Sequence, residues 1–307
     1  MRRGSPRLPQ RGSTLVELLV ALAIGLVLSG ALVITWLGNL QTNQSTMALA
    51  QLHEDGQAAL GMIAQQLRQA GYNPAAPGAD APRDLKLDGI TLFACDSGFE
   101  SITQPMPSLT CASAKPGPAA IAVAYLADRF NTVPTADTPP RATDCLGAGI
   151  AALADDNGPY FVAQNRFFVA NGNLMCAGSG GSKPFANPQP FVENVEDLRL
   201  TFGVSSPHAT GTVPAGYLSA SELGPLSGHD GVIADAGFMA LTPAQRWDKV
   251  VSVRVCLVMR SAGVVLEGRR ASQVYTGCGG MLQEATDGRM RRAFSTTVLL
   301  RNRMSGS

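Results

Sequence analysis

Residues 11–37 read RGSTLVELLVALAIGLVLSGALVITWL, and this stretch decides the fold of the chain. After Arg11 its only charged side chain is that of Glu17, and an uncharged apolar run from Leu18 to Leu37 follows at once. A helix of that length rises about 30 Å, which is the hydrocarbon thickness of a bilayer. A carboxylate at the edge of lipid is costly unless it is paired, so Glu17 is a candidate functional residue.

Four arginines lie on the N-terminal side of the apolar run: Arg2, Arg3, Arg7 and Arg11. Positive charge favours the cytoplasmic side, so the bulk of the chain is expected on the other side of the membrane. A cleavable secretory signal would have a shorter apolar core and a small-residue cleavage site, which residues 36–39 do not provide. A cleaved signal and a plain uncleaved anchor are alternatives, but neither accounts for Gly12 and Glu17.

The segment Gly12-Ser13-Thr14-Leu15-Val16-Glu17, followed directly by the apolar run, closely resembles the class III signal of type IV prepilins. This resemblance implies that a prepilin peptidase cuts between Gly12 and Ser13 on the cytoplasmic face, and that the new N-terminus is methylated. The family usually has Phe or Met at the first mature position, where this chain has Ser13. The peptidase tolerates variation at that position.

By the same resemblance, Glu17 becomes the fifth residue of the mature chain. Cleavage would free the amine of Ser13, and a nearby ammonium recovers much of the cost of a carboxylate in lipid. The resemblance implies that Glu17 meets the N-terminal amine of a neighbouring subunit and so sets the register of assembly. The alternative is a carboxylate at a helix start that interacts favourably with the helix dipole.

One long helix is predicted from about Leu15 to Ala70. Its first half is apolar all round, and in its second half the apolar residues recur at helical spacings on one face. Gly71 and Pro74 provide stop signals. This is the architecture of a pilin helix, with one half for a filament core and one half packed on a globular head. No heptad pattern persists, which disfavours a coiled-coil stalk.

Two stretches in the second half of the helix resemble the pattern LxENGRxAL…LRxAGY of PilW-type minor pilins: residues 52–60, LHEDGQAAL, and residues 67–72, LRQAGY. Further segments that resemble this family are residues 143–147, 165–169, 174–176, 192–198, 250–255 and 292–298. The resemblance covers most of the chain and is loosest across 75–140. It implies a subunit that joins other minor pilins and the major pilin in a tip complex, which primes pilus assembly and carries a tip adhesin.

Beyond Pro74 the periodicity changes from helical to alternating. Strands are predicted at residues 90–94, 119–125, 166–169, 174–176, 195–204, 249–260 and 293–301, and Asn171-Gly172-Asn173 is a hairpin signal. These runs predict an α+β fold in which an antiparallel sheet is built against the helix. Long loops are expected at residues 131–160, 178–190 and 205–245.

The chain is thus expected to comprise four parts: a cytoplasmic leader at 1–12, a transmembrane and filament-core helix at 13–40, an amphipathic helix at 41–72 and a β-rich head at 73–307.

Six cysteines all lie in the expected head: Cys95, Cys111, Cys145, Cys176, Cys256 and Cys278. An even number in an oxidising compartment favours disulfides, although about fifteen connectivities are possible. Pairing of sequence neighbours joins 95 to 111, 145 to 176 and 256 to 278. The PilW resemblance places cysteines at both Cys145 and Cys176 and favours that pair. The alternative is one reduced pair, for which Cys256 in an apolar strand is the candidate.

Signals for catalysis or metal binding are weak. Residues 178–184, GSGGSKP, superficially resemble a phosphate loop, but Pro184 prevents the helix that should follow. Residues 155–158, DDNG, offer oxygen ligands for calcium, but they lack the EF-hand pattern and are better explained as a turn. The three histidines, His53, His208 and His229, are isolated in sequence. No enzyme, cofactor or metal site is therefore predicted.

The charge balance argues against a nucleic-acid partner. The leader holds four arginines and no acidic residue, so its removal leaves 20 basic against 23 acidic residues. The expected partners are the prepilin peptidase, the inner membrane, other pilins and a tip adhesin. The expected location is the inner membrane with a periplasmic head, and then the pilus at the cell surface. The alternatives are a type II secretion pseudopilin, a membrane-anchored periplasmic binding protein and an exported enzyme.

Overall fold

The computed structural model describes residues 14–75, 82–113, 117–206, 213–224, 236–266 and 272–303. The chain forms two compact units, residues 1–48 and residues 49–307. The leader with Gly12 and Ser13 lies outside the described residues, as do His208 and His229.

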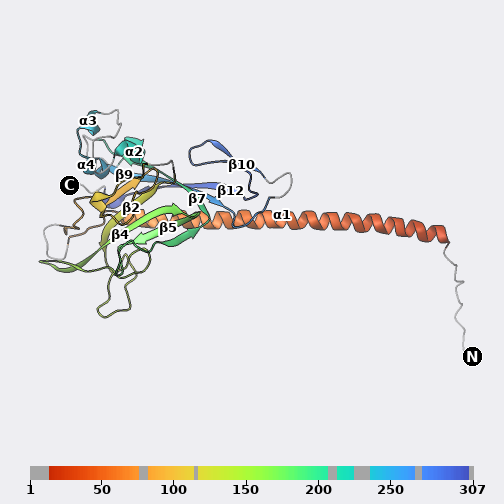
Figure 1. Ribbon diagram of the computed structural model, residues 1–307, viewed down its shortest axis with the longest axis horizontal. Helices are drawn as coiled ribbons and strands as arrows, with labels where there is room; N and C mark the ends of the chain where they lie inside the picture. Colours follow the sequence, from red (N-terminus) through yellow and green to blue (C-terminus); the bar gives the residue numbers. More distant parts are fainter. Residues whose placement is uncertain are drawn as a thin grey trace, which may run out of the picture. The chain divides into compact units, whose positions relative to one another are not determined.

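Helix α1, Leu15–Gln69, is 55 residues long and follows the predicted bounds closely (Figure 1). In the first unit its side chains point to solvent, and the hydroxyls turn back onto the helix. Ser29 Oγ donates to Gly25 O at 2.7 Å, and Thr35 Oγ1 donates to Ala31 O at 2.8 Å. These weakly polar side chains therefore satisfy their own hydrogen bonds, as a helix in lipid requires.

In the second unit α1 is amphipathic and packs into the head. Its buried face holds Leu60, Ile63 and Leu67, each no more than 3% exposed. The helix ends where Gly71 adopts a positive φ of 76° and donates its amide to Ala124 O at 2.9 Å. Glycine is favoured at this position because a side chain strains a left-handed backbone.

The first sheet has the strand order β1-β2-β4-β5-β6, with β3 paired to β4, and every pairing is antiparallel. Its strands are β1 Leu92–Cys95, β2 Ala120–Ala127, β3 Leu153–Asp155, β4 Gly158–Ala170, β5 Asn173–Gly178 and β6 Gln189–Glu193. The predicted hairpin turn joins β4 to β5, and Asn171 and Gly172 both have positive φ there. Two such residues are typical of the tight turns that match strand twist.

A second antiparallel sheet has the order β12-β9-β7-β8, and a separate two-stranded sheet pairs β10 with β11. The strands are β7 Val195–Val204, β8 Gly216–Leu218, β9 Val250–Arg260, β10 Gln273–Thr276, β11 Leu282–Ala285 and β12 Arg291–Leu299. The α+β class and the antiparallel pairing of the head strands are confirmed. The head divides its strands among three sheets, and the chain passes from the first to the second at Asn194, which lies between β6 and β7 and has a positive φ of 61°.

Short helices interrupt the region that was expected to be loop. They are α2 Ala220–Leu223, α3 Ala236–Met239 and α4 Pro243–Asp248, with 3-10 turns at Met106–Ser108 and Arg301–Arg303. Capping boxes begin two of them: Ser219 with Glu222 at α2, and Thr242 with Gln245 at α4. This Ser/Thr-x-x-Glu/Gln spacing is readable from sequence and could have predicted both helix starts.

The aromatic core joins the two large sheets. The ring of Trp247 in α4 lies 5.2 Å from that of Phe93 in β1 and 5.1 Å from that of Phe202 in β7, both edge to face. Its indole Nε1 donates to Gly224 O at 3.1 Å, so the buried polar atom is satisfied. The Trp247 side chain of α4 therefore contacts both the first sheet and the second sheet.

Candidate functional site

The start of α1 is a capping box formed by Thr14 and Glu17. The Glu17 amide donates to Thr14 Oγ1 at 3.3 Å, and the Thr14 amide donates to Glu17 Oε2 at 3.3 Å. Two free amides of the helix start are thereby satisfied by side chains. In the isolated chain the Glu17 carboxylate thus has a local partner and is also exposed to solvent. This geometry matches the helix-start alternative, and the assembly role of Glu17 stays a prediction.

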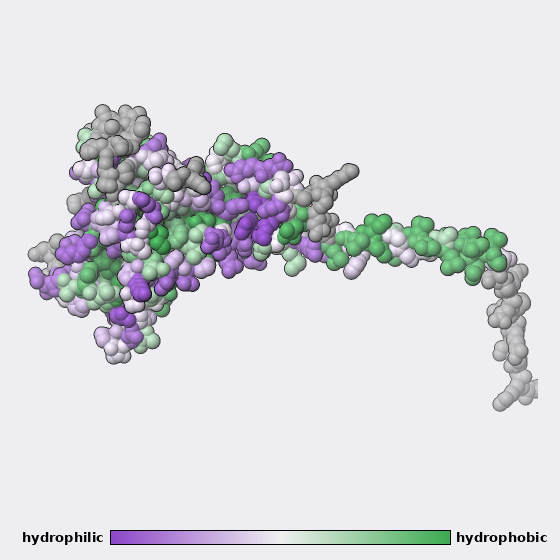
Figure 2. Space-filling view, viewed as in Figure 1, coloured by the Kyte–Doolittle hydropathy of each residue, from purple (hydrophilic) through white to green (hydrophobic). Residues whose placement is uncertain are grey.

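Among the described residues of the first unit, no other segment covers the apolar half of α1. The large apolar side chains from Leu15 to Leu37 are between 51% and 75% exposed, and Figure 2 shows an almost continuous hydrophobic surface there. Among the described residues, α1 is the one helix long and apolar enough to span a membrane, and its most apolar stretch of 18 residues has a mean hydropathy of 2.6. An apolar surface of this extent requires lipid or other helices around it.

Three glycines on this half leave the backbone open. A Cβ built at Gly25, Gly30 or Gly38 would meet no heavy atom within 4 Å. Small residues let a second helix approach the backbone closely, which is how helices pack within membranes. The same helix can therefore lie in lipid or pack against other helices.

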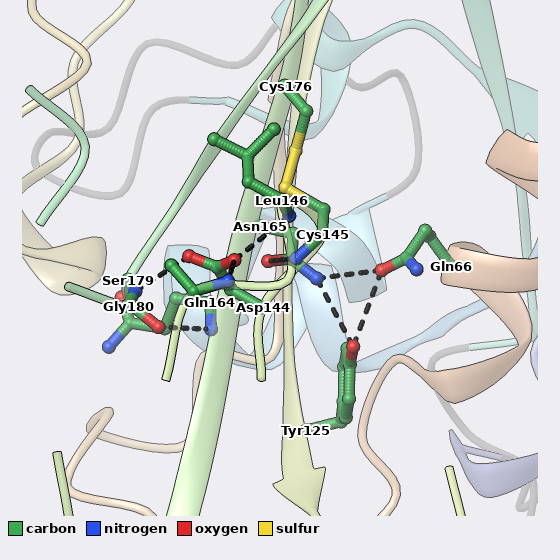
Figure 3. Close-up of a disulfide and its surroundings, with 11 residues drawn as sticks. Gln66, Tyr125, Asp144, Cys145, Leu146, Gln164, Asn165, Cys176, Ser179 and Gly180 are labelled. Atoms are coloured by element: carbon green, nitrogen blue, oxygen red, sulfur yellow. Dashed lines mark hydrogen bonds between the residues drawn. A yellow bond between two sulfur atoms is a disulfide. The ribbon is translucent and has the colours of Figure 1, made fainter. Parts of the chain in front are cut away.

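A buried polar network fastens the second half of α1 to the head (Figure 3). Asn165 in β4 donates from Nδ2 to Gln66 Oε1 in α1 at 2.7 Å and to the Tyr125 hydroxyl at 3.2 Å. Its Oδ1 accepts the amide of Cys145 at 3.0 Å. Burial raises the pKa of Tyr125 to about 12, so the phenol stays protonated and can donate.

The Cys145–Cys176 disulfide lies beside this network, with its Cα atoms 6.6 Å apart. Next to it, the Asp144 carboxylate accepts the amides of Leu146 at 2.9 Å, Ala148 at 3.0 Å and Gly180 at 2.7 Å. A carboxylate that accepts hydrogen bonds from three backbone amides fixes the shape of the two segments that carry them. These are residues 146–148 and the segment at Gly180, beside the disulfide.

The glycine run at 178–184 has a structural explanation in this geometry. Side chains at Gly178 or Gly180 would collide with Asp144 or with the Ala148 carbonyl. The amide of Gly180, which a phosphate would need, is already bound by the Asp144 carboxylate. A second anion would be repelled there, which agrees with the prediction that this run is not a phosphate loop.

The structure joins all six cysteines in the sequence-neighbour arrangement. Cys95 bonds Cys111 with Cα atoms 5.3 Å apart, and Cys256 bonds Cys278 with Cα atoms 5.7 Å apart. Cys256 is therefore not the reduced core residue of the alternative. Its bond fastens the β10–β11 hairpin to β9, because β9 holds Cys256 and Cys278 lies between the two hairpin strands.

The turn at 155–158 has a partner within the chain. Asp155 Oδ1 accepts the amide of Asn157 at 2.8 Å and the guanidinium of Arg83 at 2.6 Å. No group of three or more His, Cys, Asp or Glu side chains that could hold a metal occurs among the residues described. His53 lies on α1, with its ring 5.8 Å from that of Phe294.

Sequence reasoning missed two buried arginines that organise the head. Arg166 donates to the carbonyls of Ile102 and Gln104, stacks 3.6 Å over the Phe185 ring, and has its pKa lowered to about 10 by burial. Arg291 binds Glu196 at 2.5 Å and Asp287 at 2.6 Å. Most of these partners lie far away in sequence, so no local pattern marks them.

Residues 159–302 match the family model described as Type IV Pilus-assembly protein W, and residues 7–33 match the Prokaryotic N-terminal methylation motif. Among solved structures, the chain is similar to a type IV-like pilin from Thermus thermophilus, with 14% identity and a TM-score of 0.34. That alignment covers 83% of this chain and 97% of the other. None of the curated proteins compared with the chain matches it.

The methylation motif spans the start of α1, and the PilW match runs from β4 to the last 3-10 turn. An N-terminal methylation motif on a membrane-length apolar helix, followed by an α+β head, defines a membrane-anchored type IV pilin-like protein. Within that class, the chain is similar to the PilW family, whose model matches residues 159–302.

Proposed function

We propose that the chain is a minor pilin of a type IV pilus that takes part in the tip complex and primes pilus assembly. The observation that carries this proposal is the start of α1, where Glu17 precedes an exposed apolar helix within the segment matched by the methylation motif. This combination provides a membrane anchor, a processing signal and a charged group at one helix end. It fits a structural subunit and not an enzyme.

Processing follows from the leader. A prepilin peptidase would cut between Gly12 and Ser13 and leave residues 13–40 as the transmembrane and filament-core helix. Residues 41–72 would continue that helix into the head, and residues 73–307 would form the head. The leader arginines hold the N-terminus in the cytoplasm, so the head is periplasmic before assembly. Its three disulfides suit that oxidising compartment.

Assembly would use the charge of Glu17. In the isolated chain its carboxylate accepts the Thr14 amide, which is a neutral donor. After cleavage, the amine of Ser13 on a neighbouring subunit offers a cation, and charge-assisted hydrogen bonds are roughly twice as strong as neutral ones. Transfer of the carboxylate from its own helix cap to that amine would favour a defined register between subunits.

The head size supports a position at the tip. The second unit comprises residues 49–307 and carries loops and a tethered hairpin outside its two large sheets. A bulky head is accommodated more easily at the end of a packed filament than along its side. The partners would then be other minor pilins, the major pilin and a tip adhesin, and the final location would be the cell surface.

The proposal is tested by counting surface pili on a strain that lacks the gene, beside the same strain complemented with the wild-type gene. Few or no pili without the gene, restored by the complement, is the expected result. Normal piliation of the deletion strain would contradict the priming role. In that case, a defect in protein secretion would assign the chain to the type II secretion pseudopilins.

A further inference from the structure

A groove of about 590 Å³ lies where the chain leaves α1. Prolines and aromatic rings make up nearly half of its lining residues, including Pro74, Pro134, Pro140, Pro159, Tyr160 and Phe161. We call it the proline groove. Its volume lies within the range of roughly 300–1,000 Å³ that is usual for ligand sites.

One wall of the proline groove is a loop, residues 128–141, that its own hydrogen bonds hold in place. Asp128 Oδ1 accepts the amides of Phe130 at 2.7 Å and Asn131 at 3.0 Å. The side chain of Asn131 donates to Leu126 O at 2.7 Å, which ties the loop to the end of β2. The loop is thus shaped before any ligand arrives.

This ordered loop holds large apolar side chains in water. Phe130 is 81% exposed and Val133 is 80% exposed, although the Val133 carbonyl is bound by Thr143 Oγ1 at 2.6 Å. Exposed aromatic side chains on a fixed backbone are typical of preorganised contact residues, because little entropy remains to be lost on binding. The proline groove therefore has the character of a binding surface.

One cation of the proline groove is left for an anionic ligand. Three arginines and Asp128 line the groove; Arg83 pairs with Asp155 at 2.6 Å, Arg141 pairs with Asp137 at 2.7 Å, and Asp128 Oδ1 is bound by amides of its own loop. The third, Arg129, stacks on the Phe130 ring at 4.7 Å and forms no ion pair with any described carboxylate. A cation held over an aromatic ring beside an apolar groove is suited to pair with an acidic side chain of a ligand.

We infer that the proline groove binds an extended, acidic, proline-containing segment of another pilus protein. Such a segment presents flat pyrrolidine faces that pack on aromatic and proline side chains, and it loses little entropy because it is already extended. Arg129 would bind its carboxylate, and Phe130 would cover its prolines. The inference rests on the proposed function for the source of the segment, but the binding chemistry rests on the groove.

The test uses the full-length protein in detergent and a short fluorescein-labelled peptide of repeating proline, glutamate and leucine. The comparison peptide has lysine in place of glutamate. Fluorescence anisotropy should show the acidic peptide bound about tenfold or more tightly than the basic one. Arg129→Glu should abolish this preference, and Phe130→Ser should weaken binding of the acidic peptide about tenfold.

Matched controls remove similar groups elsewhere. Arg254→Glu reverses an exposed arginine that stacks over Tyr217, and Leu282→Ser removes an apolar side chain that is 75% exposed on β11. Both controls should bind the acidic peptide like the wild type. The inference is overturned if neither peptide binds, if both bind equally, or if the two groove variants bind like the controls.

The pilus counts keep this inference separate from the proposed function. Selective peptide binding by a chain whose deletion leaves piliation normal would support the groove and contradict the pilus role. Loss of pili on deletion, together with absent or unselective peptide binding, would support the pilus role and contradict the groove.

Discussion

The side-chain amide of Asn165 joins Gln66 to the disulfide loop, because its Nδ2 donates to Gln66 Oε1 at 2.7 Å while its Oδ1 accepts the Cys145 amide at 3.0 Å. Asn165 is fully buried, and both the nitrogen and the oxygen of its side-chain amide form hydrogen bonds (Figure 3). A satisfied buried network of this kind orients its elements and costs free energy when a member is removed. The attachment of α1 to the first sheet therefore depends on this residue.

Replacing Asn165 by Ala should lower the free energy of unfolding by about 2–4 kcal/mol, because it leaves the Cys145 amide without its partner and removes the shorter of the two hydrogen bonds to Gln66 Oε1. Urea unfolding of the full chain in detergent measures this. Gln51→Ala is the matched control, since it removes an amide that bonds Asp55 on the exposed surface of the same helix. Equal stability of the two variants would contradict the network's role.

Two glycines on α1 should respond oppositely to alanine. A Cβ at Gly56 would lie 2.6 Å from the Phe294 ring, whereas a Cβ at Gly61 would meet nothing within 4 Å. Gly56→Ala should therefore destabilise the head by about 1–3 kcal/mol through overpacking. Gly61→Ala should stabilise it by about 0.5–1 kcal/mol through helix propensity. Thermal unfolding of both variants tests this, and a stabilising Gly56→Ala would show that α1 does not pack on β12 as described.

Acid should weaken the ion pair that joins Asp287, in the segment between β9 and β12, to Arg291 at the start of β12. Asp287 binds the Arg291 guanidinium, and this hydrogen-bonded pairing holds the pKa of the Asp287 carboxyl well below its usual range. A lowered folded-state pKa gives stability that is complete at neutral pH and is lost as the pH falls below about 4. The unfolding midpoint should fall less between pH 7 and pH 3 in Asp287→Asn than in the wild type.

Asp156→Asn is the control for that experiment, since it removes an exposed carboxylate in the turn between β3 and β4. Its pH profile should follow that of the wild type. An unchanged profile for Asp287→Asn would mean that the ion pair with Arg291 does not contribute to acid sensitivity.

The capping box allows the two roles of Glu17 to be separated. Glu17→Ala removes both cap and charge, whereas Glu17→Gln keeps a side chain that can accept from the Thr14 amide but carries no charge. If assembly requires the charge, both variants should insert in the membrane and both should be depleted from sheared pili, as measured by immunoblotting. Normal incorporation of Glu17→Gln would assign Glu17 to helix capping alone.

The sequence predicted the elements whose signals are local and long. Helix α1 was expected to end at about Ala70 and ends at Gln69, because Gly71 marks the stop within the chain itself. Strand β7 has the predicted bounds, since its apolar residues alternate over its length. Strand β4 begins at Gly158 and not at Arg166, because pairing with β2 and β3 extends it.

Elements that depend on distant partners could not be predicted. Strands β10 and β11 are short and mostly exposed, so no apolar alternation marks them, and their position depends on the Cys256–Cys278 bond. Arg291 reaches Glu196, which is 95 residues away in the sequence. The proline groove is likewise assembled from the residues after α1, a loop and β4, and no single segment contains it.

If the chain is a processed prepilin that enters a surface pilus, its mature N-terminus should be found in sheared, purified pili by mass spectrometry. We expect an N-terminal peptide that begins at methylated Ser13, present in pili from wild-type cells and absent from cells that lack the prepilin peptidase. A chain that begins at Met1, stays in the membrane fraction and is missing from the pili would contradict the proposed function.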